Sequence, residues 1–348
     1  MASYWKGPVK ATPDYRNILK VLRREKPSRP TLFEFFLNGT INKLIAGPEA
    51  AARVDAGEID WMGLAVLAYR NAGYDYANVQ GSAFTFPREE RHREKSISLN
   101  EAPVITDRAS LNKYPWPDPD VADYTRLDTY AKLLADGMKL IVWGPGGVLE
   151  NVISLTGYDN LCFMLIDDPA LVQELFDAVG SRFVRYYQRC ISPPAVCAMI
   201  SNDDWGFKSQ TMISPADMRK YVFPWHTRIV DVGHKAGKPV ILHSCGNLKE
   251  VMDDIIDDMK YDAKHSYEDT IQPVEQAYEQ YGRRIAILGG IDVDFVCRST
   301  PDQVYTRSKE VIARTGCRGY ALGTGNSVPE YVPQENYFAM IAAANEGK

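Results

Sequence analysis

Residues 239–246 read PVILHSCG: an apolar run ends at His243, and a turn that contains Cys245 follows directly. Short apolar runs that alternate with helical patterns are typical of parallel β/α units. Comparable runs end near residues 264, 289 and 322, and this spacing fits one strand and one helix per unit. The second half of the chain therefore predicts consecutive β/α units.

Apolar runs of this kind recur along the whole chain. Eight are present, over Thr31–Phe36, Tyr76–Val79, Leu140–Trp143, Ala195–Ile200, Pro239–His243, Tyr261–Lys264, Ile285–Gly289 and Gly319–Leu322. No stretch between them is typical of an interdomain linker, and the sequence has no Gly-x-Gly-x-x-Gly turn. We therefore expect an α/β fold with one domain over residues 1–348, a single (β/α)8 TIM-type barrel.

Helix-start signals support this order. Ser214 precedes a proline and an acidic residue, and Thr300 with Gln303 has the pattern of a capping box. Further helices are expected after Pro169 and after Pro333.

Two segments are expected outside the barrel. An N-terminal helical extension covers about residues 1–30. A polar, proline-rich insertion after the second strand covers about residues 81–119, and we expect it to lie over one barrel mouth.

The composition excludes several classes of protein. With 45% hydrophobic and 24% charged residues, the 348-residue chain is typical of globular proteins. A net charge of −5 without a basic stripe argues against nucleic-acid binding. No apolar run reaches the ~18 residues of a membrane span, and the first residues lack the apolar core of a secretion signal. Six cysteines without dense spacing fit a reducing compartment, so we expect a cytoplasmic protein.

Polar side chains follow most of the predicted strands. In a (β/α)8 barrel the carboxyl ends of the strands carry the chemistry, because they meet at one mouth. The residues at these positions are Glu34, Asn38, Asn202, Asp203, Asp204, His243, Cys245, Lys264, His265, Asp292 and Asn326. We expect the active site among them.

The sharpest pattern is His243-Ser244-Cys245. Alternate residues of an extended strand share a face, so the imidazole and the thiol point to the same side. Both groups are zinc ligands, and the pattern indicates a metal site. The alternative is a hydrogen-bonded histidine beside a small buried thiol.

Asp203 and Asp204 follow the fourth predicted strand. Adjacent side chains on a strand point to opposite faces, so only one of the two carboxylates is expected to enter the mouth. The other would cap a loop or a helix. Asp292 follows two glycines that allow close backbone approach and is a further candidate, with loop closure as its alternative role.

Four stretches of the second half resemble the uroporphyrinogen decarboxylase-like superfamily. They are Ser201–Pro224, His243–Asn247 (HSCGN), Leu288–Asp292 (LGGID) and Gly319–Met340. The resemblance implies a (β/α)8 barrel with one of two activities. One branch decarboxylates uroporphyrinogen, and another contains cobalamin- and corrinoid-dependent methyltransferases that hold zinc with His-x-Cys and a later cysteine.

The first predicted strand bears on the choice of branch. The decarboxylases carry an arginine-rich N-terminal signature that binds substrate carboxylates, whereas residues 31–38 read TLFEFFLN, with one acid and no arginine. The methyltransferase branch is therefore favoured, with His243 and Cys245 matching its first two zinc ligands. Glu34 and Asn38 would contact the substrate.

One departure from the branch concerns its last cysteine. The resemblance places that cysteine where this chain has Asn326, and Cys317 lies ahead of the strand, at the opposite mouth. Either His265, at the end of the sixth predicted strand, completes the zinc set, or the metal has been lost. Asn326 would contact the substrate or a metal-bound water; its alternative role is a left-handed turn residue.

The resemblance and the residues together predict a methyltransferase of the O-demethylase type. It would move a methyl group from a small donor, with a methoxylated aromatic as one candidate, to the Co(I) corrinoid of a partner protein. Asp203, Asp204 and Asp292 would act in catalysis, zinc is the expected metal, and a homodimer is one option for the assembly. The alternatives are a decarboxylase acting on a small carboxylic acid or a porphyrinogen-like substrate, and a catalytically silent ligand-binding barrel.

Overall fold

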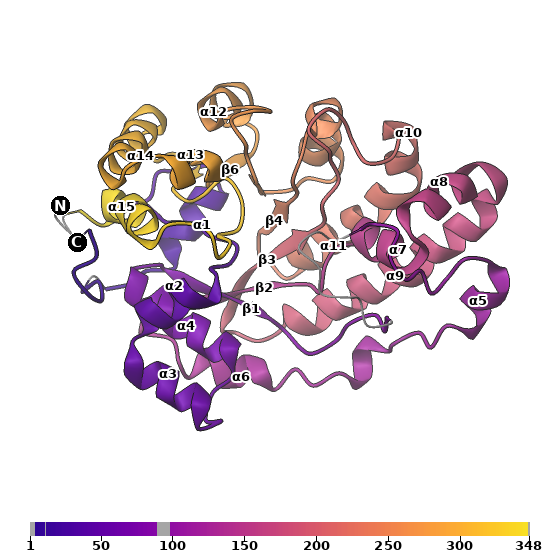
Figure 1. Ribbon diagram of the computed structural model, residues 1–348, viewed down its shortest axis with the longest axis horizontal. Helices are drawn as coiled ribbons and strands as arrows, with labels where there is room; N and C mark the ends of the chain where they lie inside the picture. The colour runs from indigo at the N-terminus through magenta and orange to yellow at the C-terminus, as the bar shows by residue number, and fades with distance from the viewer. Residues whose placement is uncertain (1–3, 11, 89–97, 347–348) are drawn as a thin grey trace.

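A computed structural model of the protein describes residues 4–10, 12–88 and 98–346. The centre of this part is a curled parallel sheet of seven strands, whose order in the sheet follows their order in the chain. The strands are β1 (Tyr76–Gln80), β2 (Lys139–Trp143), β3 (Val196–Asn202), β4 (Val240–His243), β5 (Ala263–His265), β6 (Ala286–Leu288) and β7 (Tyr320–Ala321). Helices surround the sheet, as Figure 1 shows.

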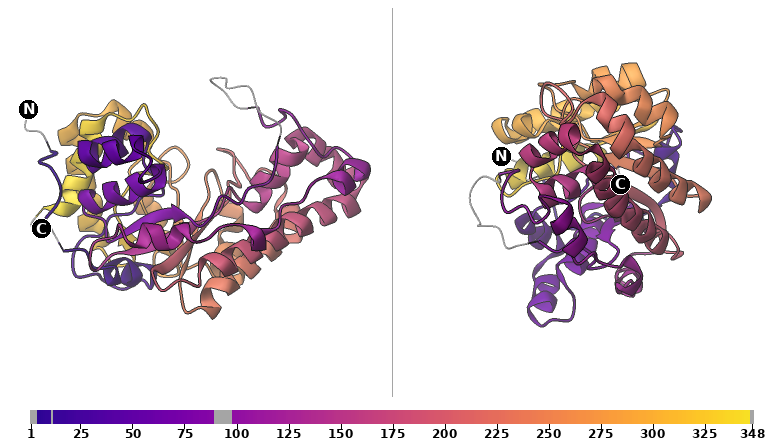
Figure 2. Two further views of the ribbon diagram at one scale, coloured as in Figure 1. Left: turned by 90° about the horizontal axis from the view of Figure 1, so that it is seen from below. Right: turned by 90° about the vertical axis from the view of Figure 1, so that its right-hand side faces the viewer.

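Most connections between the strands contain helices. The α-helices are α1 (Arg16–Leu22), α2 (Gly39–Ala46), α3 (Pro48–Asp55), α4 (Trp61–Ala72), α5 (Arg108–Lys113), α6 (Arg126–Ala131), α7 (Val148–Thr156), α8 (Tyr158–Asp167), α9 (Pro169–Cys190), α10 (Pro215–Asp217), α11 (Phe223–Lys235), α12 (Val274–Tyr281), α13 (Val293–Arg298), α14 (Pro301–Thr315) and α15 (Gln334–Asn345). Shorter helical turns are η1 (Pro119–Val121), η2 (Met218–Val222), η3 (Lys249–Val251) and η4 (Asp254–Asp258). The helices α7, α8 and α9 form one end of the molecule, whereas α2, α14 and α15 lie at the other (Figure 2).

The strand sequences explain why the sheet is buried. β3 and β4 are largely apolar, and every residue in them is buried. This is the pattern expected of a parallel sheet that is buried on both faces. Seven of the eight predicted strands are confirmed, with small shifts at their ends.

The predicted helix starts are also confirmed. Asp168 caps α9, Ser214 caps α10, and Thr300 forms a capping box with Gln303 at the start of α14. In each case a side-chain oxygen accepts a hydrogen bond from a first-turn N–H that has no partner within the helix. The last helix, α15, follows Pro333 as expected.

The first predicted strand, Thr31–Phe36, is the exception. It forms only an isolated bridge, in which Leu32 pairs with Leu322. The amide of Phe33 donates to the carbonyl of Leu322 at 2.7 Å. The prediction of eight barrel strands is therefore corrected to seven strands and one bridged segment.

On the side of β1, side chains rather than a backbone ladder bind this segment. Asn78 Nδ2 donates to the carbonyls of Glu34 and Phe35 at 2.5 and 2.6 Å. The Tyr76 hydroxyl lies 2.9 Å from the amide and 3.0 Å from the carbonyl of Glu34. Because these side chains engage the backbone groups that a ladder would use, the apolar run does not become a strand.

The two segments expected outside the barrel are described only in part. Residues 89–97 of the insertion lie outside the described residues, and the rest of it carries α5 and the start of η1. The first thirty residues contain α1, whose Ile18, Val21 and Leu22 are buried. In the part of the chain that the structure describes, no helix is long and apolar enough to cross a membrane.

We expect the substitution Asn78→Leu to lower the free energy of unfolding by about 2–4 kcal/mol, because two buried carbonyls each lose one of their donors. Chemical denaturation measures the effect. The control is Gln276→Ala on the exposed face of α12, which should stay within about 0.5 kcal/mol of the parent. An Asn78→Leu protein as stable as the parent would show that these side-chain bonds do not hold the first segment.

Candidate metal centre

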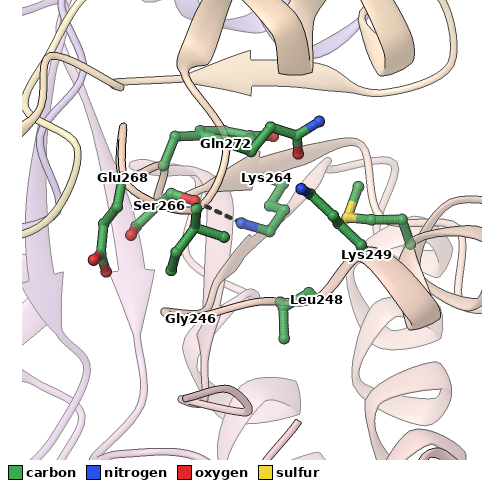
Figure 3. Close-up of a pocket in the computed structure, with 10 residues that line it drawn as sticks. Gly246, Leu248, Lys249, Lys264, Ser266, Glu268 and Gln272 are labelled. Atoms are coloured by element: carbon green, nitrogen blue, oxygen red, sulfur yellow. Dashed lines mark hydrogen bonds between the residues drawn. The ribbon is translucent and has the colours of Figure 1, made fainter. Parts of the chain in front are cut away.

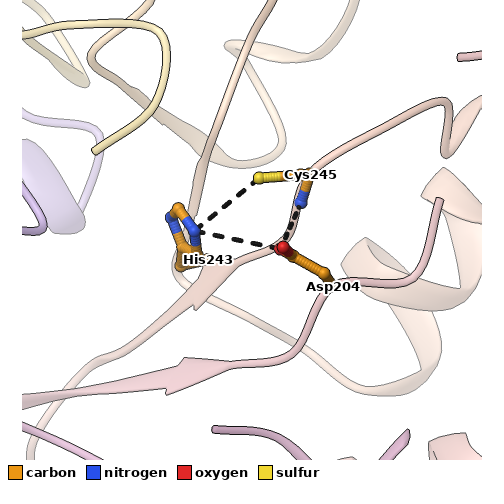
Figure 4. Close-up of side chains that lie close together, drawn as sticks. All are labelled: Asp204, His243 and Cys245. Carbon is orange, nitrogen blue, oxygen red and sulfur yellow. Dashed lines mark hydrogen bonds and ion pairs between the residues drawn. The ribbon is translucent and has the colours of Figure 1, made fainter. Parts of the chain in front are cut away.

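Three donor atoms converge at the carboxyl ends of β3 and β4. His243 is the last residue of β4, and its Nε2 lies 3.8 Å from Cys245 Sγ and 3.9 Å from Asp204 Oδ1. The three donor atoms all lie within 4.8 Å of one another, and Figure 4 shows them facing a common point. No other group of three His, Cys, Asp or Glu among the described residues brings its donor atoms this close. We call these three residues the Asp–His–Cys cluster.

Strand register brings the cluster together. Asn202 of β3 pairs with His243 of β4, and the amide of Asp203 donates to the carbonyl of His243 at 2.9 Å. The chain beyond β3 therefore passes beside the turn after β4. There the amide of Cys245 donates to Asp204 Oδ1 at 2.9 Å, which holds the carboxylate beside the thiol.

The second ring nitrogen of His243 faces away from the cluster. Its Nδ1 lies 2.8 Å from Nδ1 of His265, which pairs with His243 in the register of β4 and β5. The other nitrogen of His265, Nε2, lies 3.1 Å from the carbonyl oxygen of Thr324. Both nitrogens of His265 thus have hydrogen-bond partners, His243 and the carbonyl of Thr324. Among the described residues, the group of three close donor atoms contains Asp204 and not His265, which was the third ligand suggested from the sequence.

Burial controls the protonation of the cluster. His243 is only 5% exposed, and burial lowers its pKa to about 3, with the charge of Lys264 as a smaller cause. Burial raises the pKa of the Cys245 thiol well above its usual range, and the neighbouring Asp204 adds to the shift. Without a metal, therefore, the cluster holds a neutral imidazole and a neutral thiol at pH 7. A bound divalent cation would reverse the preference at sulfur, because it stabilises the thiolate.

The two adjacent aspartates have different surroundings. Asp203 is fully buried, and its carboxylate accepts hydrogen bonds from the amides of Leu149 and Glu150 at the start of α7, at 2.8 and 2.9 Å. Nε2 of His226 lies 2.9 Å from the same carboxylate. The side chain of Asp204 is 43% exposed and reaches the mouth. The expected divergence of the two side chains is thus seen in the geometry.

Two further candidates bind the backbone. Asn38 caps α2 by accepting a hydrogen bond from the amide of Ile41, and its Nδ2 donates to the carbonyl of Pro329. Asp292 caps α13, and its second carboxylate oxygen accepts a hydrogen bond from the amide of Asp269 at 2.8 Å. The structure therefore gives both side chains a local partner for each polar group.

The last two candidates lie around the turn after β7. Asn326 Nδ2 donates to Cys245 Sγ at 3.2 Å, so this side chain contacts the cluster directly. Glu34 is fully buried, and its carboxyl group accepts a hydrogen bond from the amide of Thr324 at 2.7 Å. Burial raises the pKa of Glu34 from its ordinary value of 4.5 to about 8.

Two cavities lie near the cluster. One has a volume of about 710 Å³ and reaches Asp204. Its lining includes Phe86, Arg88, Leu99, Glu150 and Met212. The other, of about 1110 Å³, reaches Asn326 and has Phe36, Asp292 and Tyr331 in its lining. The first cavity thus contacts the cluster directly, whereas the second reaches only Asn326 beside it.

Sequence reasoning missed Glu150. It is the third residue of α7, and burial raises its pKa to about 8, with Asp203 and Asp204 adding to the shift. No strand-end pattern marks it, because it reaches the cavity from a helix start. The Gly146-Gly147 pair before α7 is the sequence signal that could have pointed to a close backbone approach here.

Lys264 lies in β5, behind the cluster, and lines a water-sized cavity of about 20 Å³ (Figure 3). Its Nζ donates to the carbonyl of Ser266 at 2.6 Å and lies 4.4 Å from the centre of the Tyr267 ring. Burial lowers the pKa of Lys264 to about 8. The structure thus buries a cation next to a cluster that contains a carboxylate.

Comparison with known proteins identifies the family. The family model described as uroporphyrinogen decarboxylase (URO-D) matches residues 92–347. A methylated-thiol–coenzyme M methyltransferase of Methanosarcina mazei is 27% identical over 197 residues, which are 55% of this chain. That alignment spans about half of the relative, 49% of its length. A uroporphyrinogen decarboxylase of Anaeromyxobacter dehalogenans is 24% identical over 317 residues, 87% of this chain and 86% of the relative.

A solved structure shares the fold. It is a methyltransferase from Methanosarcina mazei, with a TM-score of 0.69 and 16% sequence identity. The superposition covers 97% of this chain and 99% of that chain. At this level of identity the similarity establishes a common architecture over nearly the whole chain.

The two adjacent aspartates should respond differently to substitution. Asp203→Asn should lower the free energy of unfolding by about 2–3 kcal/mol, because a buried carboxylate that accepts charge-assisted bonds is lost. Asp204→Asn should leave the melting temperature nearly unchanged, because the amide still offers an oxygen to Cys245, but should weaken zinc binding at least ~10-fold. Thermal unfolding and zinc titration of both variants make the comparison. Equal losses of stability and of zinc affinity in the two variants would contradict the division.

Stability should depend on pH through Glu34. A carboxyl group whose pKa is raised on folding keeps its proton in the folded chain after the unfolded chain has lost it. Stability therefore falls as pH rises from the ordinary pKa of 4.5 to the folded value of about 8, and this effect is constant above that value. The Glu34→Gln variant has no proton to lose at this position, so it should lack this loss of stability. The difference in melting temperature, variant minus parent, should therefore increase from pH 5 to pH 8. A pH-independent difference between the two proteins would refute the raised pKa.

Proposed function

Because the chain belongs to the uroporphyrinogen decarboxylase family, we propose that it is one of the family's methyltransferases. It moves a methyl group from a small donor to the Co(I) corrinoid of a partner protein. The observation that carries the proposal is the Asp–His–Cys cluster, which offers nitrogen, sulfur and oxygen donors at the mouth. The similarity to a methylated-thiol–coenzyme M methyltransferase supports methyl transfer as the reaction class.

The donor set suits zinc. Imidazole, thiolate and carboxylate are the ligands that zinc takes in proteins, and three protein ligands leave a fourth position for a substrate. In a tetrahedral site with bonds of about 2.0–2.3 Å, ligand atoms lie roughly 3.3–3.6 Å apart. The observed 3.8 and 3.9 Å need only a small contraction. Zinc held here would supply a Lewis acid that stabilises a thiolate or polarises an ether oxygen of the donor.

The residues of the chain would bind and orient the donor. His243, Cys245 and Asp204 would hold the metal, and the charges of the carboxylate and the thiolate would balance its two positive charges. The apolar side chains of Phe86 and Met212 in the neighbouring cavity exclude water and suit an apolar or aromatic methyl donor. The donor methyl group would then lie at the mouth, where a partner can reach it.

An exposed apolar rim supports docking of a corrinoid protein. Phe36 is 45% exposed and Tyr331 is 74% exposed, and both line the larger cavity. Exposed aromatic side chains at the edge of a cavity are typical of surfaces that a partner protein covers. The partner would bring its corrinoid over this rim.

The second candidate function is a decarboxylase, which the long alignment with a uroporphyrinogen decarboxylase favours. Among the described residues that line the 710 Å³ cavity, Arg88 is the one basic residue beside two acids, Glu150 and Asp204. Such a lining is poorly suited to a polycarboxylate substrate, because it offers one cation to several carboxylates. The methyltransferase is therefore preferred.

One assay separates the candidates. The zinc-loaded protein is incubated with cob(I)alamin and a panel of methylated thiols and methoxylated aromatics, and methylcobalamin is followed by absorbance. We expect methylcobalamin with at least one donor, and a loss of at least ~100-fold in Cys245→Ser, because a hydroxyl is a far weaker zinc ligand than a thiolate. Zinc analysis should show about one ion per parent chain and almost none in the variant.

Two outcomes would decide against the proposal. Release of CO2 from a carboxylic acid without cobalamin, together with no methylcobalamin from any donor, would favour the decarboxylase. A protein that binds no zinc and shows neither reaction would favour the silent ligand-binding barrel. The exposed substitution Gln276→Ala serves as the matched control in each assay.

A further inference from the structure

A line of buried hydrogen bonds connects Glu34 to His243. It runs from the Glu34 carboxyl group to Thr324, from the Thr324 carbonyl to His265, and from His265 to His243. All four residues are buried. Because each link joins groups of known donor or acceptor character, the positions of the protons along the line can be worked out.

The first step concerns His265. Its Nε2 lies 3.1 Å from the carbonyl oxygen of Thr324, and a carbonyl only accepts, so this nitrogen carries a proton. His265 is fully buried against the ring of Phe33, and its hydrogen-bond partners are the uncharged carbonyl of Thr324 and the ring of His243, so the ring is neutral. A neutral imidazole has one N–H, and Nδ1 of His265 is therefore an acceptor.

The second step concerns His243. Its Nδ1 lies 2.8 Å from the bare Nδ1 of His265 and must be the donor. His243 is also buried, and a ring that keeps one proton in this interior therefore carries it on Nδ1. Its Nε2 is left with an unprotonated lone pair, and this nitrogen faces Cys245 and Asp204.

The third step concerns the other end of the line. The Thr324 hydroxyl lies 2.7 Å from Oε2 of Glu34 and also hydrogen-bonds the carbonyl of Asn326. A hydroxyl has one proton, and the carbonyl can only accept it. The bond between Glu34 and the hydroxyl then needs a proton from Glu34, so the carboxyl group is a neutral acid that donates to Thr324. The amide of Thr324 donates to its other oxygen.

The turn over residues 323–326, which hydrogen-bonds Glu34 through Thr324, packs closely against its neighbours. A Cβ on Gly323 would lie 1.7 Å from the carbonyl oxygen of Phe33, and a Cβ on Gly325 would lie 2.1 Å from that of Tyr267. The two glycines therefore let the turn approach the first segment on one side and the end of β5 on the other. The same turn carries Asn326, whose amide group donates to Cys245 Sγ.

We propose that Glu34, as a neutral acid acting through Thr324 and His265, is a positioning residue that fixes the metal-binding nitrogen of His243. The same turn fixes the hydrogen bond that Asn326 makes to the cysteine. The inference rests on the proposed function only in that it assigns a metal to the cluster. Glu34 and Asn326 thereby have a role different from substrate contact.

The first test uses metal-free protein labelled with 15N in histidine. Two-bond 1H–15N correlation spectra show which ring nitrogen of each histidine carries the proton. We expect His243 to be protonated on Nδ1 and His265 on Nε2. A proton on Nε2 of His243 in the parent protein overturns the proposal, whatever the protein catalyses.

The second test compares two substitutions of Glu34. Glu34→Gln keeps one acceptor and one donor, so the proton positions and the zinc affinity should stay within about 3-fold of the parent. Glu34→Met keeps the size but loses both bonds, so His243 should show mixed proton positions. Its zinc affinity, measured by competition with a chelator, should fall at least ~10-fold, as is usual when a partner of a metal ligand is lost.

Controls keep the second test decisive. Glu275 is a buried glutamate that pairs with Arg307, and Glu275→Gln should lower stability while leaving the proton on Nδ1 of His243. If Glu34→Met does not fold, Thr324→Val removes the hydroxyl link instead, with the same expected result. Unchanged proton positions and zinc affinity in the folded variant would overturn the proposal. A parent protein with the expected proton positions but no zinc and no methylcobalamin would refute the proposed function alone.

Discussion

The register of β3, β4 and β5 at their carboxyl ends is the constraint on which the cluster depends. Asn202 pairs with His243, and His243 pairs with His265, so the imidazoles lie side by side at one level of the sheet. A shift of one residue in either ladder would turn a histidine to the other face, because side chains alternate along a strand. The apolar residues before these positions are buried on both faces and make such a shift costly.

Burial then decides how each polar group at this level is used. Two carboxyl groups show the range. Asp203 accepts two amide hydrogen bonds at the start of α7, a position that favours a negative charge. Glu34 accepts one amide bond and otherwise faces a hydroxyl, so desolvation dominates and the proton stays on. One buried carboxyl group thus binds the first amides of a helix, whereas the other is held as a neutral acid.

Local pattern was enough to predict most of the fold and part of the site. Apolar runs bounded by helix signals gave the strands, and the period of two along a strand placed His243 and Cys245 on one side. Local pattern could not predict that Thr31–Phe36 does not form a strand. Its partner Asn78 is more than forty residues away in the sequence and binds it by a side chain. The place of His265 depends on which nitrogen of His243 faces the next strand, and no sequence pattern specifies that. The raised pKa of Glu150 depends in part on Asp203 and Asp204, which reach it only through the fold.

The position of Asn326 shows how the cluster can stay balanced without a second thiolate. An amide brings no charge, so in the proposed zinc site Asp204 would supply the second negative charge that a bound dication needs. The side-chain nitrogen of Asn326, Nδ2, donates to Cys245 Sγ at 3.2 Å. Its side-chain oxygen accepts a hydrogen bond from the backbone amide of Ser327 at 2.7 Å, and the two bonds together fix the orientation of the side chain. A hydrogen bond to a thiolate draws electron density from sulfur and weakens it as a metal ligand. The metal would then attract the fourth ligand more strongly, so an asparagine at this position favours binding of the substrate over a closed structural site.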